Sequence, residues 1–272
     1  MIPELIVVGA GPGDPELITL KAQKALQRAA VVMYDNLINR ELLDYAPAGS
    51  EKIYVGKKPY GEYTPQEEIH RLILEKATGK GCVVRLKGGD PFIFGRGMEE
   101  ILFARGHGIV TSYIPGITSM QAAGFDDIPL THRSLSESVW FVTGTKADGT
   151  LSHDLKLAMQ SKATVVIYMG MKKLESIART YQEEGLGDMP AAIIQHASLP
   201  NRKMARGAVK DLPHLAEAGE LKHPAIIIIG AVAGIGFGDT GGAGGAAGDP
   251  SGVGGAAADP GAATDPGGAA AL

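Results

Sequence analysis

The sequence lacks the residues that build disulfides and common metal sites. It has one cysteine, Cys82, in 272 residues, so no disulfide forms within the chain. Its seven histidines are scattered, and neither an HExxH nor a CxxC pattern occurs, so we expect no bound metal and a reducing compartment. No basic leader precedes the apolar run at the N-terminus, and the longest apolar stretch, residues 225–238, is shorter than the ~20 residues of a membrane span. These absences predict a soluble, cytoplasmic protein.

Basic residues are also absent from residue 236 onward. That stretch is mostly Gly and Ala and contains four aspartates, which account for the whole net charge of −4, so residues 1–235 are formally neutral. A neutral body has no broad positive field for nucleic acid, and we expect no nucleic-acid partner. An anionic substrate would need a local cluster of Arg and Lys. The Gly/Ala composition of residues 236–272, with three Asp-Pro pairs, predicts a disordered tail.

The first half alternates strand-like and helix-like segments. Five short apolar runs are typical of strands: residues 4–9, 30–35, 51–56, 81–86 and 109–116. Residues 15–29 predict one helix with Asp14 as N-cap, and Thr64 with Glu67 predicts a capping box. That second helix should bury the face Ile69, Leu72, Ile73 and Ala77. The alternation predicts a mostly parallel sheet with helices on both faces.

A polar break at residues 128–138 precedes a second α/β set, which includes a helix burying Leu174, Ile177, Ala178 and Tyr181, and a hairpin at "RKMARGAV". The predicted fold class is α/β, with two α/β domains and a cleft between them, a place that small ligands favour. The expected boundaries are 1–128 for the N-terminal domain, 129–137 for a linker, 138–235 for the C-terminal domain and 236–272 for the tail.

The loop "GAGPGD" after the first strand partly fits a dinucleotide-binding fingerprint. Gly9 and Gly11 match, and Asp35 ends the next strand where an acid would hold a ribose. However, Asp14 stands in the place of the third glycine, and its carboxylate would repel a pyrophosphate. An NAD(P)-dependent oxidoreductase therefore stays open as the weaker alternative.

The loop "KGGDPFIFGRG", residues 87–97, has many glycines but lacks the features of a phosphate cradle, because Asp90 would oppose an anion. Glycines beside a carboxylate suit a large ligand that lies against the backbone and carries positive charge, such as S-adenosylmethionine. The alternative is a tight turn capped by Asp90.

Several segments carry a family resemblance between Leu5 and Ala233. They are "VGAGPGDPELITLKA", "VVMYDNL", "VGKK", "TPQEEI", "VVRLKGGDPFIFGRG", "PGITS", "IPLTHR", "VTGT" and "YMGM". The chain resembles the S-adenosylmethionine-dependent tetrapyrrole methyltransferase family, and within it the uroporphyrinogen-III C-methyltransferases. The resemblance implies two methyl transfers from S-adenosylmethionine to uroporphyrinogen III, giving precorrin-2 for sirohaem or cobalamin and S-adenosylhomocysteine as by-product. It also implies a homodimer with the active site between two α/β domains.

The resemblance also implies site residues. Asp35 and Lys57 match a proton acceptor and donor, and Arg96 is a secondary candidate for the base. Asp35 as a helix cap and Lys57 as a solvated loop cation stay open. Arg96, Glu99 and Arg133 should face the tetrapyrrole. The methyl donor should contact Pro12, Gly88, Gly89, Asp90, Ile93, Thr118, Ser119, Met169 and Ala197, although Met169 also suits an apolar core.

The chain departs from the family pattern at Met98, where a second glycine is common, and at Phe125, Asp126 and Asp127, where the chain is one residue short. A sister methyltransferase acting on a later corrin intermediate, or on a protein, is a further alternative. The segments "FGRG" and "PLTHR" favour uroporphyrinogen.

Overall fold

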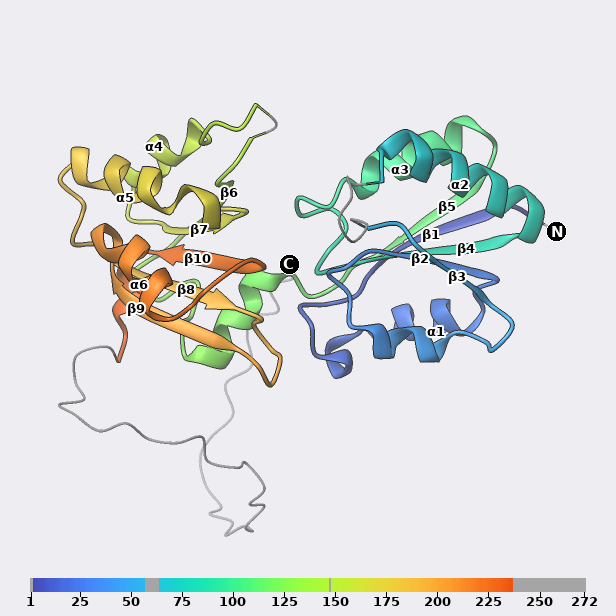
Figure 1. The fold of residues 1–272 in the computed structure, drawn as a ribbon, viewed down its shortest axis with the longest axis horizontal. Coiled ribbons are helices and arrows are strands. Elements are labelled where there is room, and N and C mark those ends of the chain that lie inside the picture. Colours follow the sequence, from blue (N-terminus) through green and yellow to red (C-terminus); the bar gives the residue numbers. More distant parts are fainter. Residues whose placement is uncertain (1, 57–63, 147, 237–272) are drawn as a thin grey trace, which may run out of the picture. The chain divides into compact units, whose positions relative to one another are not determined.

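The protein is described by a computed structural model that covers residues 2–56, 64–146 and 148–236. These residues form two separate sheets with helices packed on them (Figure 1), which confirms the predicted α/β class. None of the helices in this part of the chain is long and apolar enough to cross a membrane. Residues 237–272, nearly all of the predicted tail, lie outside the described residues.

The first sheet has the strand order β3-β2-β4-β1-β5, and all its neighbouring strands are parallel, as predicted. Its central strands are apolar on both faces because helices cover both sides, so Leu5 and Val7 point to one helix layer and Ile6 and Val8 to the other. The strands are β1 (Glu4–Gly9), β2 (Val31–Tyr34), β3 (Glu51–Tyr54), β4 (Cys82–Lys87) and β5 (Val110–Ile114).

Two helix layers enclose this sheet (Figure 1). The helix α1 (Leu20–Gln27) and the 3-10 helix η2 (Arg40–Tyr45) cover one face. The helices α2 (Gln66–Lys80) and α3 (Gly97–Gly106) cover the other. The predicted apolar face of α2 is confirmed, since Ile69, Ile73 and Ala77 are buried and Leu72 packs against the same core.

The sequence mispredicts two helix starts. Asp14 caps only a short 3-10 helix, η1 (Pro15–Leu17), by accepting from the amide of Glu16, and α1 then begins afresh with Thr19 accepting from the amide of Ala22. The single helix predicted over residues 15–29 is therefore wrong. The predicted capping box of α2 is also wrong, because the Thr64 hydroxyl donates to the carbonyl of Gly56 and Pro65 is the N-cap residue.

The second sheet has the order β6-β7-β10-β8-β9 and is mixed. Only β6 and β7 pair in parallel among its described neighbours; the other three pairings are antiparallel. The segment "RKMARGAV" supplies one strand, β9, that pairs with β8, so the hairpin predicted within it is wrong. The strands are β6 (Val139–Thr143), β7 (Thr164–Tyr168), β8 (Pro190–Gln195), β9 (Lys203–Ala208) and β10 (Ala225–Ile229).

Helices again cover both faces of this sheet. On one face lie α4 (Asp154–Met159), α5 (Leu174–Glu183) and α6 (Leu212–Ala218), and the predicted buried face of α5 is confirmed. The 3-10 helices η3 (Ser119–Asp126) and η6 (Ala231–Gly234) cover the other face. Two shorter turns, η4 (Met171–Lys173) and η5 (Val209–Asp211), precede α5 and α6. Because η3 packs on the second sheet, the chain reaches that core before β6 begins; the proposed domain boundaries stay a prediction.

We expect Thr19→Ala to lower the free energy of unfolding by about 1 kcal/mol, because the first turn of α1 loses its only side-chain cap. Urea unfolding followed by circular dichroism measures it. The matched control is Thr78→Ala, whose exposed hydroxyl bonds back to the carbonyl of Leu74 within α2 and should change stability by less than about 0.5 kcal/mol. Equal losses in the two variants would contradict the capping role of Thr19.

Candidate functional site

The loops that follow β1, β4 and β5 approach one another backbone to backbone. Parallel strands end at the same edge of a sheet, so these exits are neighbours. A Cβ atom on Gly9 would lie 2.7 Å from the carbonyl oxygen of Gly89, and one on Gly116 would lie 2.8 Å from the Cα of Gly9. The amide of Gly89 also donates to the carbonyl of Gly11 at 2.7 Å, and the amide of Gly11 donates back at 3.3 Å. The glycines are therefore needed for close packing between loops.

The carboxylate of Asp90 holds the β4 loop together. Its Oδ1 accepts from the amide of Phe92 at 2.7 Å, and its Oδ2 accepts from the hydroxyl of Tyr113 at 2.6 Å and from the amide of Gly116 at 3.1 Å. Burial, with the hydrogen bond to Asp90, raises the pKa of Tyr113, so the phenol stays a donor. The ring of Tyr113 stacks on Phe92 with centroids 3.9 Å apart. Asp90 therefore does cap the turn, and its contact with a ligand stays a prediction.

The loop after β2 brings Asp35 to the same edge. A Cβ atom on Gly88 would lie 2.8 Å from the carbonyl oxygen of Leu37, so the β2 and β4 loops touch. Asp35 Oδ1 accepts from the amide of Leu37 at 3.0 Å, and its side chain is 20% exposed. The next helix, η2, is capped by Asn39 instead, so the interpretation of Asp35 as that helix cap is wrong.

A buried group of charges lies beside Asp35. Arg85 and Lys87 on β4 share one oxygen of Glu100 from α3, Oε1, at 3.3 and 3.0 Å. Arg85 Nη2 also lies 3.6 Å from Asp35 Oδ2. Glu100 is fully buried and Arg85 is 3% exposed. Burial, and then the nearby charge of Arg85, lower the pKa of Lys87.

Three hydrogen bonds connect the loops of the first sheet to segments of the second. The hydroxyls of Thr118 and Tyr168 lie 2.8 Å apart, and the amide of Met120 donates to the same tyrosine at 3.2 Å. Burial raises the pKa of Tyr168, which keeps it protonated. The amide of Asp14 donates to the Ser198 hydroxyl at 3.0 Å.

These contacts place the residues expected to bind the methyl donor. Thr118 takes part directly, and Ser119 follows it in the same loop. Pro12 precedes Asp14 by two residues, and Ala197 directly precedes Ser198, so both lie close in sequence to the contact between Asp14 and Ser198. Met169 directly follows Tyr168. Met169 is 53% exposed, so its interpretation as a core residue is wrong.

The residues expected to face the acceptor are exposed. Arg96 is the N-cap residue of α3 and pairs with Glu99 through two hydrogen bonds of 2.9 and 2.6 Å, and this pairing lowers the pKa of Glu99. Ile93 is partly buried in the same loop. Arg133 is exposed and makes no ion pair within the described residues, so the structure does not link it to the others. Lys57 lies outside the described residues.

Comparison with known proteins identifies the family of the chain and agrees with its fold. Residues 4–213 match the Tetrapyrrole (Corrin/Porphyrin) Methylases. The chain belongs to the tetrapyrrole methylase family. It is 42% identical to the uroporphyrinogen-III C-methyltransferase of Methanocaldococcus jannaschii, over 86% of this chain and 98% of that one. It is also 43% identical to the siroheme synthase of Thiobacillus denitrificans, over 84% of this chain, but it spans only 48%, about half, of that longer protein.

The backbone of a solved structure matches that of this tetrapyrrole methylase over most of both chains. The crystal structure of uroporphyrin-III C-methyl transferase from Thermus thermophilus, complexed with S-adenyl homocysteine, has a TM-score of 0.73 and 40% sequence identity, covering 85% of this chain and 99% of that one.

The sequence analysis missed Arg85, Lys87 and Glu100 of this methylase. A signal was present, because two basic residues interrupt the otherwise apolar strand "CVVRLK" and buried charges need partners. It also missed Tyr168, although this residue opens the quoted segment "YMGM", and Ser198. Nothing in the sequence pairs Ser198 with Asp14, 184 residues away.

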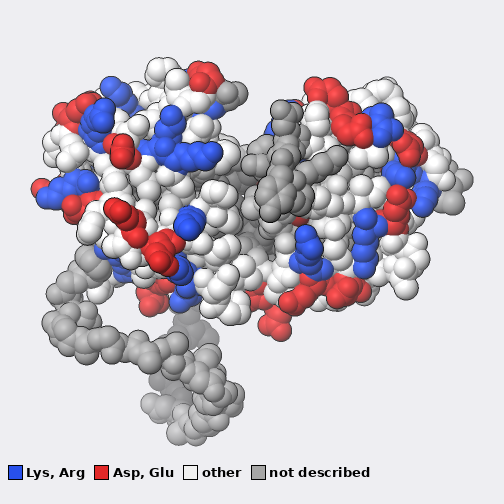
Figure 2. Space-filling model, in the orientation of Figure 1, with Lys and Arg blue, Asp and Glu red and all other residues white. Residues whose placement is uncertain are grey.

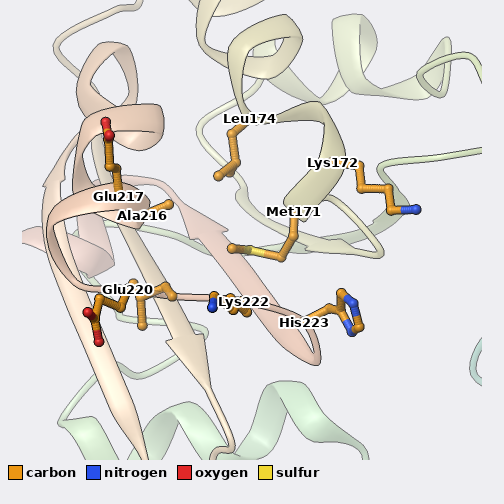
Figure 3. A pocket seen from close by; sticks show the side chains of 9 residues that line it. Met171, Lys172, Leu174, Ala216, Glu217, Glu220, Lys222 and His223 are labelled. Atoms are coloured by element: carbon orange, nitrogen blue, oxygen red, sulfur yellow. The ribbon is translucent and has the colours of Figure 1, made fainter.

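The methylase also has a hollow of about 570 Å³ beside α6. Met171 and Leu174 contribute apolar surface, with Lys172 and His223 on one side and Glu217 and Glu220 on the other (Figure 3). None of the site residues expected from the sequence lines it. On the face shown in Figure 2, the basic and acidic side chains of the described residues are interspersed and form no large patch of one charge.

We expect Gly116→Ala to destabilise the methylase by about 1–3 kcal/mol, because the new methyl group would overlap the backbones of Gly9 and Gly89. Thermal and urea unfolding measure this. In Gly79→Ala, the control near the end of α2, the added methyl meets open space and should be neutral or stabilise by up to about 1 kcal/mol. Wild-type stability of the Gly116 variant would show that the loops do not pack as described.

Proposed function

We propose that this protein transfers methyl groups from S-adenosylmethionine to two ring carbons of uroporphyrinogen III and so forms precorrin-2. The observation that carries the proposal is the 42% identity to the Methanocaldococcus enzyme of that name, which extends over 98% of that enzyme. The product would feed sirohaem or cobalamin synthesis. The homodimer and the cytoplasmic location stay predictions.

The loops around Gly89 suit the proposed donor. Gly88 has no side chain and is partly exposed, so a flat ligand can approach its backbone beside the contact with Leu37. The carboxylate of Asp90 is 8% exposed, and its buried negative charge favours a cation over a phosphate. The related Thermus enzyme was crystallised with S-adenyl homocysteine, the demethylated form of this donor. The proposed contacts are Pro12, Gly88, Gly89, Asp90, Ile93, Thr118, Ser119, Met169 and Ala197.

Catalysis would depend mainly on positioning. S-adenosylmethionine supplies a methyl group that a pyrrole carbon can attack directly, so the protein needs to align the two reactants and exclude water. Guanidinium groups bind carboxylates with two hydrogen bonds, which makes Arg96 and Arg133 the proposed clamps for the acidic macrocycle. Because Arg96 is paired with Glu99, a substrate carboxylate would compete with that glutamate.

Asp35 is the proposed acceptor of the proton that leaves the methylated ring. Its Oδ1 is fixed by the amide of Leu37, and the side chain keeps 20% exposure, so a proton can reach it. Lys57 stays the proposed partner acid. Arg96 is less suited to be the base, since arginine does not lose its proton in proteins.

Incubation of the purified protein with uroporphyrinogen III and methyl-labelled S-adenosylmethionine should give a doubly labelled tetrapyrrole. Calorimetric titration should show binding of S-adenosylhomocysteine and none of NADPH. A later corrin intermediate offered as acceptor is the control for a sister methyltransferase. Label transfer to that intermediate alone, or to no tetrapyrrole, would refute the proposed substrate.

Arg96→Ala should reduce methyl transfer to uroporphyrinogen III by at least about tenfold, because a bidentate carboxylate contact is lost. The affinity for S-adenosylhomocysteine should stay within about twofold, since the exposed side chain of Arg96 is not among the proposed donor contacts. The matched control is Arg71→Ala, which removes an exposed arginine from an i,i+3 pair with Glu68 on α2 and should leave transfer unchanged. Parallel loss of donor and acceptor binding in Arg96→Ala would contradict this division of roles.

A further inference from the structure

We propose that Arg85 is a positioning residue, which holds the carboxylate of Asp35 in place from a buried ionic cluster formed with Lys87 and Glu100. The inference rests on the proposed function, because Asp35 acts there as the proton acceptor. Arg85 would touch neither the methyl donor nor the macrocycle, and would act through Asp35.

The sheet register places the two side chains together. Strands β2 and β4 are parallel neighbours, with Met33 opposite Arg85. Asp35 follows Met33 by two residues, and residues two apart in an extended chain lie on the same face. Arg85 and Lys87 are related in the same way on β4. Asp35 and both basic side chains therefore project toward the helix layer of α2 and α3, where Glu100 lies.

Two of the three nitrogens of the Arg85 guanidinium are fixed by hydrogen bonds, and the third faces Asp35 as an ion pair. Nε donates to Glu100 Oε1 at 3.3 Å, and Nη1 donates to the carbonyl of Leu86 at 3.0 Å. The remaining nitrogen, Nη2, faces Asp35 Oδ2 at 3.6 Å. Asp35 is in turn held through Oδ1 by the amide of Leu37. The carboxylate thus lies between a loop amide and a cation that cannot swing away.

Charge balance also favours the position of the Asp35 carboxylate beside Arg85. Two buried cations share a single oxygen of Glu100, whose other oxygen has no hydrogen-bond partner among the described residues. One carboxylate cannot neutralise both cations, and uncompensated charge in a protein interior is strongly unfavourable. Asp35 is the carboxylate that faces Arg85 from the neighbouring strand. Burial lowers the pKa of Lys87 most, and the nearby charge of Arg85 lowers it further.

The test compares Arg85→Met, Arg85→Lys and Asp35→Asn, with the double variant Arg85→Met/Asp35→Asn. Arg85→Met should lower kcat for methyl transfer at least about tenfold, with KM for the macrocycle and the affinity for S-adenosylhomocysteine within about twofold. Arg85→Lys keeps the charge and should have an intermediate kcat. In the Asp35→Asn background, Arg85→Met should cause no further loss, because its effect passes through Asp35.

The matched control is Arg28→Met, which removes an arginine paired with Glu4 at the opposite end of the same sheet and should leave kcat unchanged. A wild-type kcat in Arg85→Met, or an equal loss with and without Asp35, would overturn the inference. If Arg85→Met does not fold, Arg85→Lys and Glu100→Gln replace it in the same cycle.

A second readout does not depend on the proposed activity. In a crystal structure of Arg85→Met, or of Arg85→Lys if the first variant does not fold, the Asp35 carboxylate should leave its hydrogen bond with the Leu37 amide or take more than one conformer. An unmoved carboxylate would overturn the inference. An inactive wild type would refute the proposed function alone, and the crystal structures would still decide the role of Arg85.

Discussion

The structure depends on the close approach of three backbones at the edge where the parallel strands of the first sheet end. Gly9, Gly89 and Gly116 pack tightly against one another. A methyl group added to Gly9 or to Gly116 would overlap the backbone of the other two glycines. This packing brings the loops after β1, β4 and β5 to one place, and the contact of Gly88 with Leu37 adds the loop after β2. Ligand sites in parallel sheets form at this edge because the strand exits converge there.

Around this glycine contact, the polar side chain of Asp90 makes its hydrogen bonds within the loops of the protein. Asp90 uses both oxygens within the protein, and Tyr113, Phe92 and Gly116 are its partners. The loop is therefore preorganised, and a ligand meets fixed backbone instead of a mobile side chain. Preorganisation is what a methyl transfer needs, because the reaction gains most from alignment.

The charged side chains of Arg85, Lys87 and Glu100 are buried in the protein interior. Arg85, Lys87 and Glu100 lie where apolar residues would cost less, and replacing buried ion pairs by apolar residues is often neutral or stabilising. The cluster at the end of β4 faces Asp35, whose side chain is 20% exposed, and the proposed role of Asp35 would account for these buried charges. Glycine is favoured at the start of α3 for a separate reason, because a Cβ on Gly97 would lie 2.9 Å from the Cβ of Pro91.

The sequence by itself determined the parallel first sheet, the apolar faces of α2 and α5, the glycine loops and the family, because these are encoded in local periodicity and in contiguous motifs. The prediction of a helix cap failed at Thr64, because its hydroxyl donates to the carbonyl of Gly56 instead of capping α2. Only the tertiary structure decided the mixed pairing of the second sheet, the contact of Asp14 with Ser198 and the partners of Asp35. Such contacts depend on strand order and register, which bring together residues far apart in the chain, and no local pattern specifies them.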